Sequence, residues 1–176
     1  RRHTRSLCDW SSDVCSSDLD LRTRRVVLAC GAWLPQLLPS LPFPLQVIEQ
    51  DVGYFAVDAP TEQQRVGVFP VWARIGADAS DFRYGLPEFE RRGLKCAQHR
   101  TTGEGIHPDQ RATSVDHAAL WELGRTSFAA PVRQLIDSER CLYTVAPNED
   151  LIVQVAPADP RIAILAACSE IGRAHV

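Results

Sequence analysis

Two continuous apolar runs near the ends of the chain differ in pattern from everything between them. Residues 25–30 and 161–168 form these runs, and continuous runs are typical of strands buried on both faces, as in parallel sheets. Each run ends in small residues, which let a ligand or another backbone approach closely. A helical turn rich in Leu and Pro follows the first run through Leu38. We therefore expect both runs in one parallel sheet.

Between the two runs the pattern changes to an alternation of apolar and polar residues. Residues 52–57, 68–73, 82–86 and 94–99 alternate in this way and are separated by Gly, Pro, Asp and charged residues. Such short alternating segments between turn residues are typical of antiparallel strands. The central part of the chain is therefore expected to form an antiparallel sheet.

A helix and a last pair of strands complete the central part. Ser114 can cap a helix of about four turns. Residues 141–145 and 151–155 are predicted to pair with each other across a turn at Pro147 and Asn148. The helix is expected to cover one face of the antiparallel sheet.

These elements predict an α/β plus α+β fold, in which one domain is inserted into another. The chain leaves a parallel sheet after Cys30, forms an antiparallel sheet with one covering helix, and returns at Arg161. We assign residues 20–40 and 159–169 to the parallel-sheet domain and residues 41–158 to the inserted domain. Ligands are expected at their junction.

Composition is that of an ordinary globular protein of about one domain. The chain has 176 residues, a net charge of −3 and 45% hydrophobic residues, so no basic surface for nucleic acid is predicted. No apolar run approaches the ~20 residues of a membrane helix, and no secretory signal is visible. We expect a cytoplasmic protein that binds neither nucleic acid nor membrane. Because the chain has no methionine, even at position 1, we expect an internal fragment.

The two ends resemble translated sequencing adapter. Back-translation of residues 9–19 gives a sequence similar to a short-read adapter, and residues 2–5 resemble the upstream part of the same oligonucleotide. Residues 171–176 resemble its opposite strand. We therefore leave residues 1–19 and 170–176 out of fold reasoning and expect them to be disordered.

Four cysteines remain after this exclusion, namely Cys30, Cys96, Cys141 and Cys168. None of them forms a C-x-x-C pair, so neither a zinc site nor a dithiol redox motif is predicted. Scattered thiols of this kind suit a reducing compartment.

Candidate chemistry gathers on a few predicted strands. Lys95, the only lysine of the chain, shares a strand face with His99, because side chains alternate with period two. Cys141 and Tyr143 share a face for the same reason, and Tyr84 precedes a Gly-Leu-Pro turn. If the faces meet, one site would hold an amine, an imidazole, a thiol and two phenols. Each residue alone is more often packing or solvated surface, so spacing leaves the function open.

At these residues the chain resembles a known family. The segments that carry the resemblance are, in chain order, Gly31-Ala32-Trp33, Tyr84-Gly85-Leu86-Pro87, Gly93-Leu94-Lys95 with His99, Pro108-Asp109, Cys141-Leu142-Tyr143-Thr144 and residues 162–169. Their order and spacing are similar to those of the monomeric sarcosine oxidase and N-methyltryptophan oxidase family of FAD-dependent amine oxidases. The resemblance covers nearly all of residues 20–169.

The resemblance implies a cofactor and the residues that hold it. The parallel sheet would be part of a Rossmann-like FAD-binding domain, and the inserted antiparallel sheet would be the substrate domain. Cys141 matches the cysteine that holds FAD through a covalent thioether, and Gly31 and Trp33 match a segment that approaches the cofactor. A nearby cation would favour the thiolate form of Cys141. Arg140 is the nearest cation in sequence, but it should point to the other face.

The resemblance also implies catalytic roles. Lys95 matches a lysine that helps oxygen accept electrons, because a fixed cation stabilises negative charge that develops on oxygen. His99, Tyr84 and Tyr143 match residues on the substrate side. The implied reaction converts a secondary (N-methyl) or cyclic amino acid to an imine and reduces oxygen to hydrogen peroxide. The parent protein would be a monomer, and this fragment alone would be inactive.

Departures from the family pattern leave alternatives open. Asn148 and Leu151 stand where the family usually has an aspartate and a phenylalanine, and the glycine-rich dinucleotide loop is absent. The alternatives are a glycine or D-amino-acid oxidase, a dehydrogenase of the same fold, and a non-enzymatic amino-acid-binding module. A cysteine hydrolase is disfavoured, because no sequence feature pairs Cys141 with His99 as its base.

Overall fold

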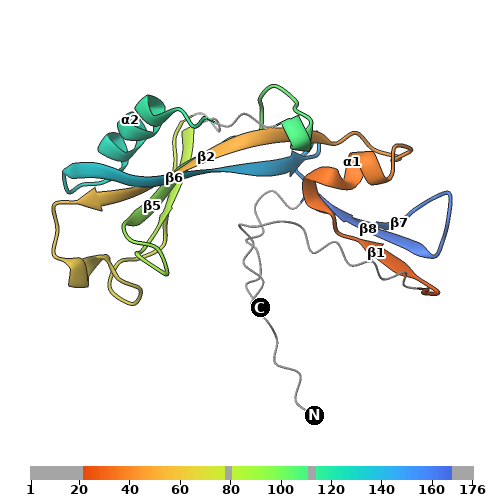
Figure 1. Ribbon diagram of the computed structural model, residues 1–176, viewed down its shortest axis with the longest axis horizontal. Coiled ribbons are helices and arrows are strands. Elements are labelled where there is room, and N and C mark those ends of the chain that lie inside the picture. Colours follow the sequence, from red (N-terminus) through yellow and green to blue (C-terminus); the bar gives the residue numbers. More distant parts are fainter. Residues whose placement is uncertain (1–21, 78–80, 111–113, 168–176) are drawn as a thin grey trace, which may run out of the picture.

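The structure, a computed structural model, describes residues 22–77, 81–110 and 114–167, and this part of the chain forms two sheets. Helix α1 (Leu34–Leu37) packs on a three-stranded sheet, and helix α2 (His117–Ser127) covers a five-stranded sheet (Figure 1). Two long strands of the five-stranded sheet, β2 (Gln46–Val57) and β6 (Val132–Val145), extend toward the three-stranded sheet. Among the described residues no helix has the length and apolar character to cross a membrane. The adapter-like ends, residues 1–19 and 170–176, lie outside the described residues.

The smaller sheet joins the beginning and the end of the described chain. β1 (Val26–Leu28) pairs in parallel with β8 (Ile162–Ala166), which confirms that the two apolar runs belong to one sheet. β7 (Ile152–Val155) pairs antiparallel with the other edge of β8, so the sheet is mixed. Burial of β1 on both faces was predicted and is wrong, because Val27 is 66% exposed.

A short helical segment packs against this sheet. η1 (Gly31–Trp33) leads into α1 (Leu34–Leu37), and the fully buried Leu34 packs against Ile164. Gly31 has a φ of 53°, a left-handed conformation that glycine adopts without strain. This residue therefore allows the chain to turn from β1 into η1.

The predicted pairing of residues 141–145 with residues 151–155 is wrong. Residues 141–145 end β6, whose partner is β2, whereas β7 pairs with β8. In the turn between them the N–H of Glu149 donates to the carbonyl of Ala146. This turn leads the chain from the large sheet into the small one. The turn residues marked where the chain changes direction, but they do not select the neighbouring strand.

The larger sheet is antiparallel and contains the strands of the central part. Its spatial order is β3 (Trp72–Ile75), β4 (Phe82–Leu86), β5 (Leu94–His99), β2 (Gln46–Val57) and β6 (Val132–Val145). The bounds predicted for β4 and β5 are confirmed. The predictions for β2 and β6 covered only the last residues of longer strands, and β3 begins four residues later than predicted. Short 3-10 turns lie between β2 and β3, at η2 (Thr61–Gln64), and between β5 and α2, at η4 (Pro108–Gln110).

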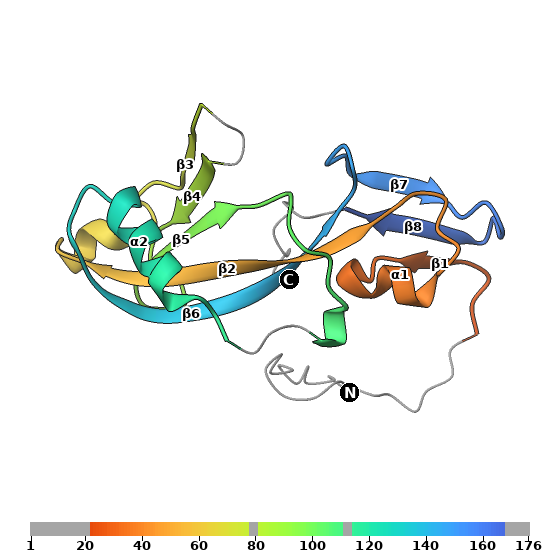
Figure 2. The ribbon, with the colours of Figure 1, turned by 90° about the horizontal axis from the view of Figure 1, so that it is seen from above.

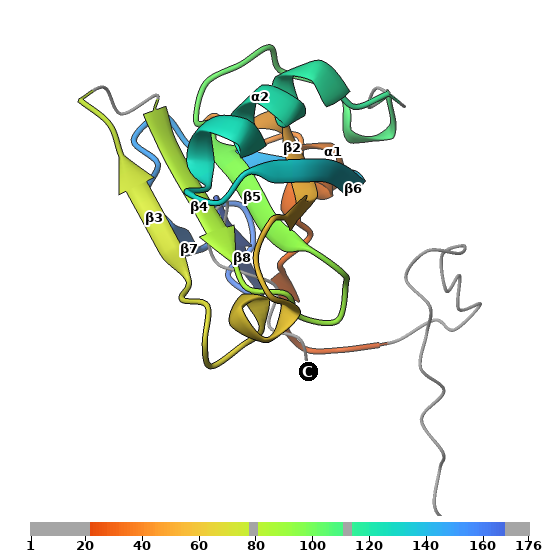
Figure 3. The same ribbon diagram turned by 90° about the vertical axis from the view of Figure 1, so that its left-hand side faces the viewer.

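Helix α2 (His117–Ser127) covers one face of this sheet (Figures 2 and 3). Its cap is Asp116, whose side chain accepts a hydrogen bond from the N–H of Ala119 at 3.0 Å. The predicted cap, Ser114, is therefore wrong by two residues, although Asp is an equally good capping residue. The covered face is apolar, with Phe55, Cys96 and Leu120 at its centre.

Two glycines let α2 approach β2 closely. A Cβ atom added at Gly53 or at Gly124 would overlap the ring of Phe55. Phe55 itself is fully buried and makes an edge contact with Phe128, with ring centroids 5.8 Å apart. The Phe55 ring thus fills the space that side chains at the two glycines would otherwise occupy.

An ion-pair cluster on the helix-covered face ties β2 to β6. Arg140 donates two hydrogen bonds to the carboxylate of Asp51, at 2.5 and 2.8 Å, and lies 3.1 Å from Glu49. Burial raises the pKa of Asp51, but the hydrogen bond and charge of Arg140 outweigh burial and hold this pKa below its usual value. The N–H of Asp116 also donates to Asp51, at 3.4 Å. Arg140 therefore points away from Cys141, as the alternation predicts.

We expect the substitution Gly124→Ala to destabilise the chain by about 1–3 kcal/mol, because the added methyl group overpacks against Phe55. At an ordinary helix position the same change would stabilise by about 1 kcal/mol. Chemical denaturation of Gly124→Ala in the native and Phe55→Leu backgrounds measures the effect, and the smaller side chain should reduce the cost. Ala118→Gly, at an exposed position of α2, serves as the control for helix propensity. A higher stability for Gly124→Ala would contradict the packing described here.

Loss of the Arg140 cluster should make stability less sensitive to acid. Because the folded pKa of Asp51 is depressed, its contribution is present above the unfolded value of about 3.9 and is lost as pH falls through the lower folded value. Arg140→Gln should therefore cost about 2 kcal/mol at pH 7 and much less at pH 3. Thermal unfolding of both proteins across this pH range gives the difference. An equal cost at both pH values would show that the ion pair is not its source.

Candidate functional site

Five of the seven predicted site residues lie on one face of the large sheet. Directly opposed residues in an antiparallel ladder share a face. On β2, Tyr54 opposes Lys95, and Gln50 opposes Cys141. The face that carries Tyr84, Lys95, His99, Cys141 and Tyr143 is called the open face below. The open face is the one opposite α2. Phe55 and Cys96, which pack with α2, lie at the alternate positions of their strands and so point to the other face.

Three aromatic side chains meet on the open face. The hydroxyl oxygens of Tyr84 and Tyr143 are 3.3 Å apart, although β4 and β6 are not neighbouring strands. The ring of His99 lies 5.5 Å from that of Tyr143 and 5.2 Å from that of Phe82. His99 is only 6% exposed. The structure therefore brings the imidazole and both phenols together in one polar and aromatic cluster.

Cys141 carries a half-buried thiol on the same face and forms no disulfide. It packs against the buried residues Val52, Tyr54 and Ala97. Cys96, on the other face, differs in environment, because burial raises the pKa of its thiol to about 11. The neutral form of Cys96 is thereby favoured, and its place in the core beneath α2 makes it a packing residue. Cys141 is the more accessible of the two thiols.

Lys95 lies in a charged cluster that the sequence analysis missed. Its Nζ is 4.0 Å from Oε1 of Glu139, which also accepts a hydrogen bond from the Tyr54 hydroxyl at 2.7 Å. Arg91 donates to Oε2 of Glu139 at 2.9 Å, and its guanidinium lies 5.2 Å from the centre of the Tyr54 ring. Burial, followed by the hydrogen bond to Glu139, raises the pKa of Tyr54 well above its ordinary value. Tyr54 therefore stays a hydrogen-bond donor.

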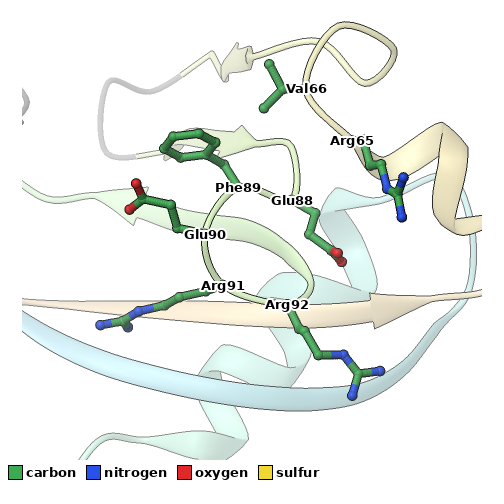
Figure 4. Close-up of a pocket in the computed structure, with 7 residues that line it drawn as sticks. All are labelled: Arg65, Val66, Glu88, Phe89, Glu90, Arg91 and Arg92. Atoms are coloured by element: carbon green, nitrogen blue, oxygen red, sulfur yellow. The ribbon is translucent and has the colours of Figure 1, made fainter.

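One member of this cluster could have been found from the sequence. Glu139 precedes Cys141 by two residues and so shares its face. It was missed because the predicted strand began at residue 141. Arg91 comes from the turn between β4 and β5, where no periodicity applies. Figure 4 shows that Arg91 and Arg92 leave this turn in different directions.

Lys95 and Cys141 stand on opposite sides of β2 and are separated along it. Their partners on β2, Tyr54 and Gln50, are four residues apart, which corresponds to about 13 Å along a strand. Lys95 and Cys141 are therefore too far apart along the sheet for one ligand atom to contact the backbone of both. An extended ligand that lies along β2 could reach both side chains.

The other two predicted residues, Gly31 and Trp33, do not lie on the open face. They belong to η1, which contacts β6 from the side of the small sheet. The indole N–H of Trp33 donates to Asp109 at 2.8 Å, and this bond ties η1 to η4. The structure thus places both residues next to the junction of the two sheets and apart from the other five.

Two hollows on the surface of the described part of the chain are lined by none of the predicted site residues. The larger, about 410 Å³, lies around the turn between β4 and β5 and is lined by Arg65, Val66, Glu88, Phe89, Glu90, Arg91 and Arg92 (Figure 4). The other, about 350 Å³, lies where β2 begins and β6 ends. In the described part of the chain no group of His, Cys, Asp and Glu could hold a metal ion.

Comparison with known proteins gives a consistent set of relatives. No protein-family model matches the chain. The chain is 28% identical over 152 residues to monomeric sarcosine oxidase of Arthrobacter sp. (strain TE1826), which covers 82% of this chain and 38% of the relative. It is 24% identical over 159 residues to N-methyl-L-tryptophan oxidase of Citrobacter koseri, with 88% and 41% covered. The chain thus spans about two fifths of the length of these relatives.

Solved structures share the fold. NikD, an unusual amino acid oxidase essential for nikkomycin biosynthesis, matches in its open form with a TM-score of 0.60 and 16% identity, over 80% of this chain and 39% of NikD. Iminodiacetate oxidase from Chelativorans sp. BNC1 matches with a TM-score of 0.56 and 17% identity, over 85% and 38%. The resemblance seen in the sequence is confirmed: over most of its length, the chain is a distant homologue of monomeric sarcosine oxidase and N-methyltryptophan oxidase.

Proposed function

We propose that the chain is part of an FAD-dependent amine oxidase. The proposed reaction converts a secondary (N-methyl) or cyclic amino acid to an imine and reduces oxygen to hydrogen peroxide. One observation carries the proposal: a thiol, an ammonium, an imidazole and two phenols share the open face of a chain that is distantly homologous to sarcosine oxidases. The relatives are much longer, so we place the Rossmann-like dinucleotide-binding part mostly outside this chain.

The side chains of the open face fit a flavin. The thiol of Cys141 is only half-buried and forms no disulfide, so it suits a thioether bond to the cofactor. Aromatic side chains beside it offer surfaces for a planar ring. Gly31 and Trp33, on the side of the small sheet, would contact the cofactor near the junction of the two sheets. The bound flavin would supply the acceptor for two electrons from the amine.

Lys95 is the proposed activator of oxygen. Its side chain is 28% exposed and carries the only lysine ammonium in the chain. A fixed cation at the face where oxygen is reduced stabilises the negative charge that develops on oxygen. Because a desolvated site has a lower effective dielectric constant than water, the effect would be larger once the open face is covered.

His99, Tyr84 and Tyr143 would form the substrate side. The nearly buried imidazole and the paired phenol hydroxyls can orient an amine and a carboxylate through hydrogen bonds. An amine must be neutral to lose a hydride equivalent, and a desolvated aromatic surrounding favours its neutral form. The expected monomeric state and cytoplasmic location stay predictions.

Replacement of Cys141 should release the cofactor. We expect the full-length protein to be yellow and to retain flavin after acid denaturation, whereas Cys141→Ser should lose it, because serine cannot form the thioether. Cys30→Ser, at the other half-buried thiol, is the matched control and should retain flavin. The 176-residue chain alone should stay colourless with added FAD. Release of all flavin from the unsubstituted protein would rule out the covalent bond.

Replacement of Lys95 should separate the two halves of the reaction. In Lys95→Met, reduction by N-methylglycine or proline under anaerobic conditions should persist, whichever of the two is a substrate. Reoxidation by oxygen should slow on the order of a hundredfold, the size of effect seen when one stabilising group is removed. Stopped-flow absorbance measures both rates, and Lys95→Arg controls for charge. Unchanged reoxidation would refute the proposed role of Lys95 in the reaction with oxygen.

A further inference from the structure

Glu139 connects Lys95 to two other strands and one turn. Its Oε1 accepts the Tyr54 hydroxyl hydrogen bond and is the oxygen nearest to Lys95, while its Oε2 accepts from Arg91. Both carboxylate oxygens therefore have partners. Tyr54, on β2 between β5 and β6, is only 8% exposed, so the donor that orients Oε1 is itself held by packing.

This arrangement bears on the position of a flexible side chain. A lysine ammonium sits on a four-carbon stem with several rotatable bonds and is strongly hydrated, so an exposed lysine is poorly placed unless a partner fixes it. The Lys95 and Glu139 side chains are 28% and 31% exposed, which leaves each of them partly desolvated. The Tyr54 ring lies beneath both cations, 5.2 Å from Arg91 and 6.0 Å from Lys95.

The charges around Lys95 also allow a matched comparison. Asp137 lies two residues before Glu139 on β6 and is 3.8 Å from Arg91. It is more exposed than Glu139. Substitution at Asp137 removes the same unit of charge from the same strand, but it leaves the hydrogen bonds of Glu139 in place.

We propose that Glu139 is the positioning residue for Lys95: held by Tyr54 and Arg91, it keeps the lysine ammonium over the open face, where the proposed function needs it. The contact with Lys95 is a property of this chain and can be tested without flavin. The consequence for oxygen rests on the proposed function, and so the two are tested separately.

The first test uses the fact that Lys95 is the only lysine of the chain. An acetylating ester of N-hydroxysuccinimide will modify Lys95, and peptide mass spectrometry reports its rate of modification. Glu139→Gln should raise this rate about threefold or more, because the amine is no longer held by an ionic partner. The rate for Glu139→Asp should fall between those for Glu139→Gln and the unsubstituted chain. The rate for Asp137→Asn should equal that of the unsubstituted chain. An unchanged rate in Glu139→Gln would overturn the proposal, as would an equal rise in Asp137→Asn.

The second test uses the full-length flavoprotein. Glu139→Gln should slow reoxidation by oxygen about tenfold, while anaerobic reduction by the amine should change less than about twofold. The reason is that misplacement of the Lys95 ammonium affects only the step that uses Lys95. In the Lys95→Met background the same substitution should have no further effect, since Glu139 acts through Lys95. Glu139→Asp should restore part of the rate, and Asp137→Asn should have none of these effects.

The outcomes separate the proposal from the proposed function. If Lys95→Met leaves reoxidation unchanged, the proposed role of Lys95 fails, whereas the labelling result for Glu139 still stands or falls by itself. If Lys95→Met is slow and Glu139→Gln is as fast as or faster than the unsubstituted protein, the positioning role is overturned. Should Glu139→Gln not fold, Tyr54→Phe removes the 2.7 Å hydrogen bond alone and should shift both measurements in the same direction by a smaller amount.

Discussion

The antiparallel pairing of β2 with β6 is the constraint on which the rest of the structure depends. It extends from Gln46 opposite Val145 to Val57 opposite Val132, with register shifts only near its far end. Because side chains alternate between faces, a slip of one residue in β6 would move Cys141 and Tyr143 beneath α2 and bring Arg140 to the open face. The bidentate contact of Arg140 with Asp51 opposes such a slip, because a partly buried arginine would lose its carboxylate partners.

Local sequence predicted the elements better than their partners. β4 and β5 alternate cleanly between turn residues, so their bounds followed from period and turn chemistry alone. The place of β1 and β8 in one sheet followed from their continuous apolar character, whereas their direct pairing did not. The neighbour of β7 could not be predicted from its local sequence, since its alternation suits either sheet. Only the packing of the folded chain selects β8 as its neighbour. Pairing between distant segments is decided by tertiary contacts that no local pattern carries.

The alternation of side chains along a strand was enough to predict which site residues on one strand share a face, but it gave no information about residues outside strands. It placed Lys95 with His99 and Cys141 with Tyr143, and the register shows that both pairs share one face. It could not supply Arg91, which reaches this face from a turn. It would have supplied Glu139 had the full length of β6 been recognised. Prediction of this part of the site was therefore limited by the length assigned to β6.

The close fit of Phe55 between Gly53 and Gly124 has a consequence for how this sheet can vary. Beneath α2 this packing constrains alternate positions of β2 and β5, and the intervening positions of the same strands carry open-face side chains. The two sets are interleaved along the chain but separated in space by the thickness of one sheet. Exposed positions of the open face can therefore vary without any change to the packing around Phe55.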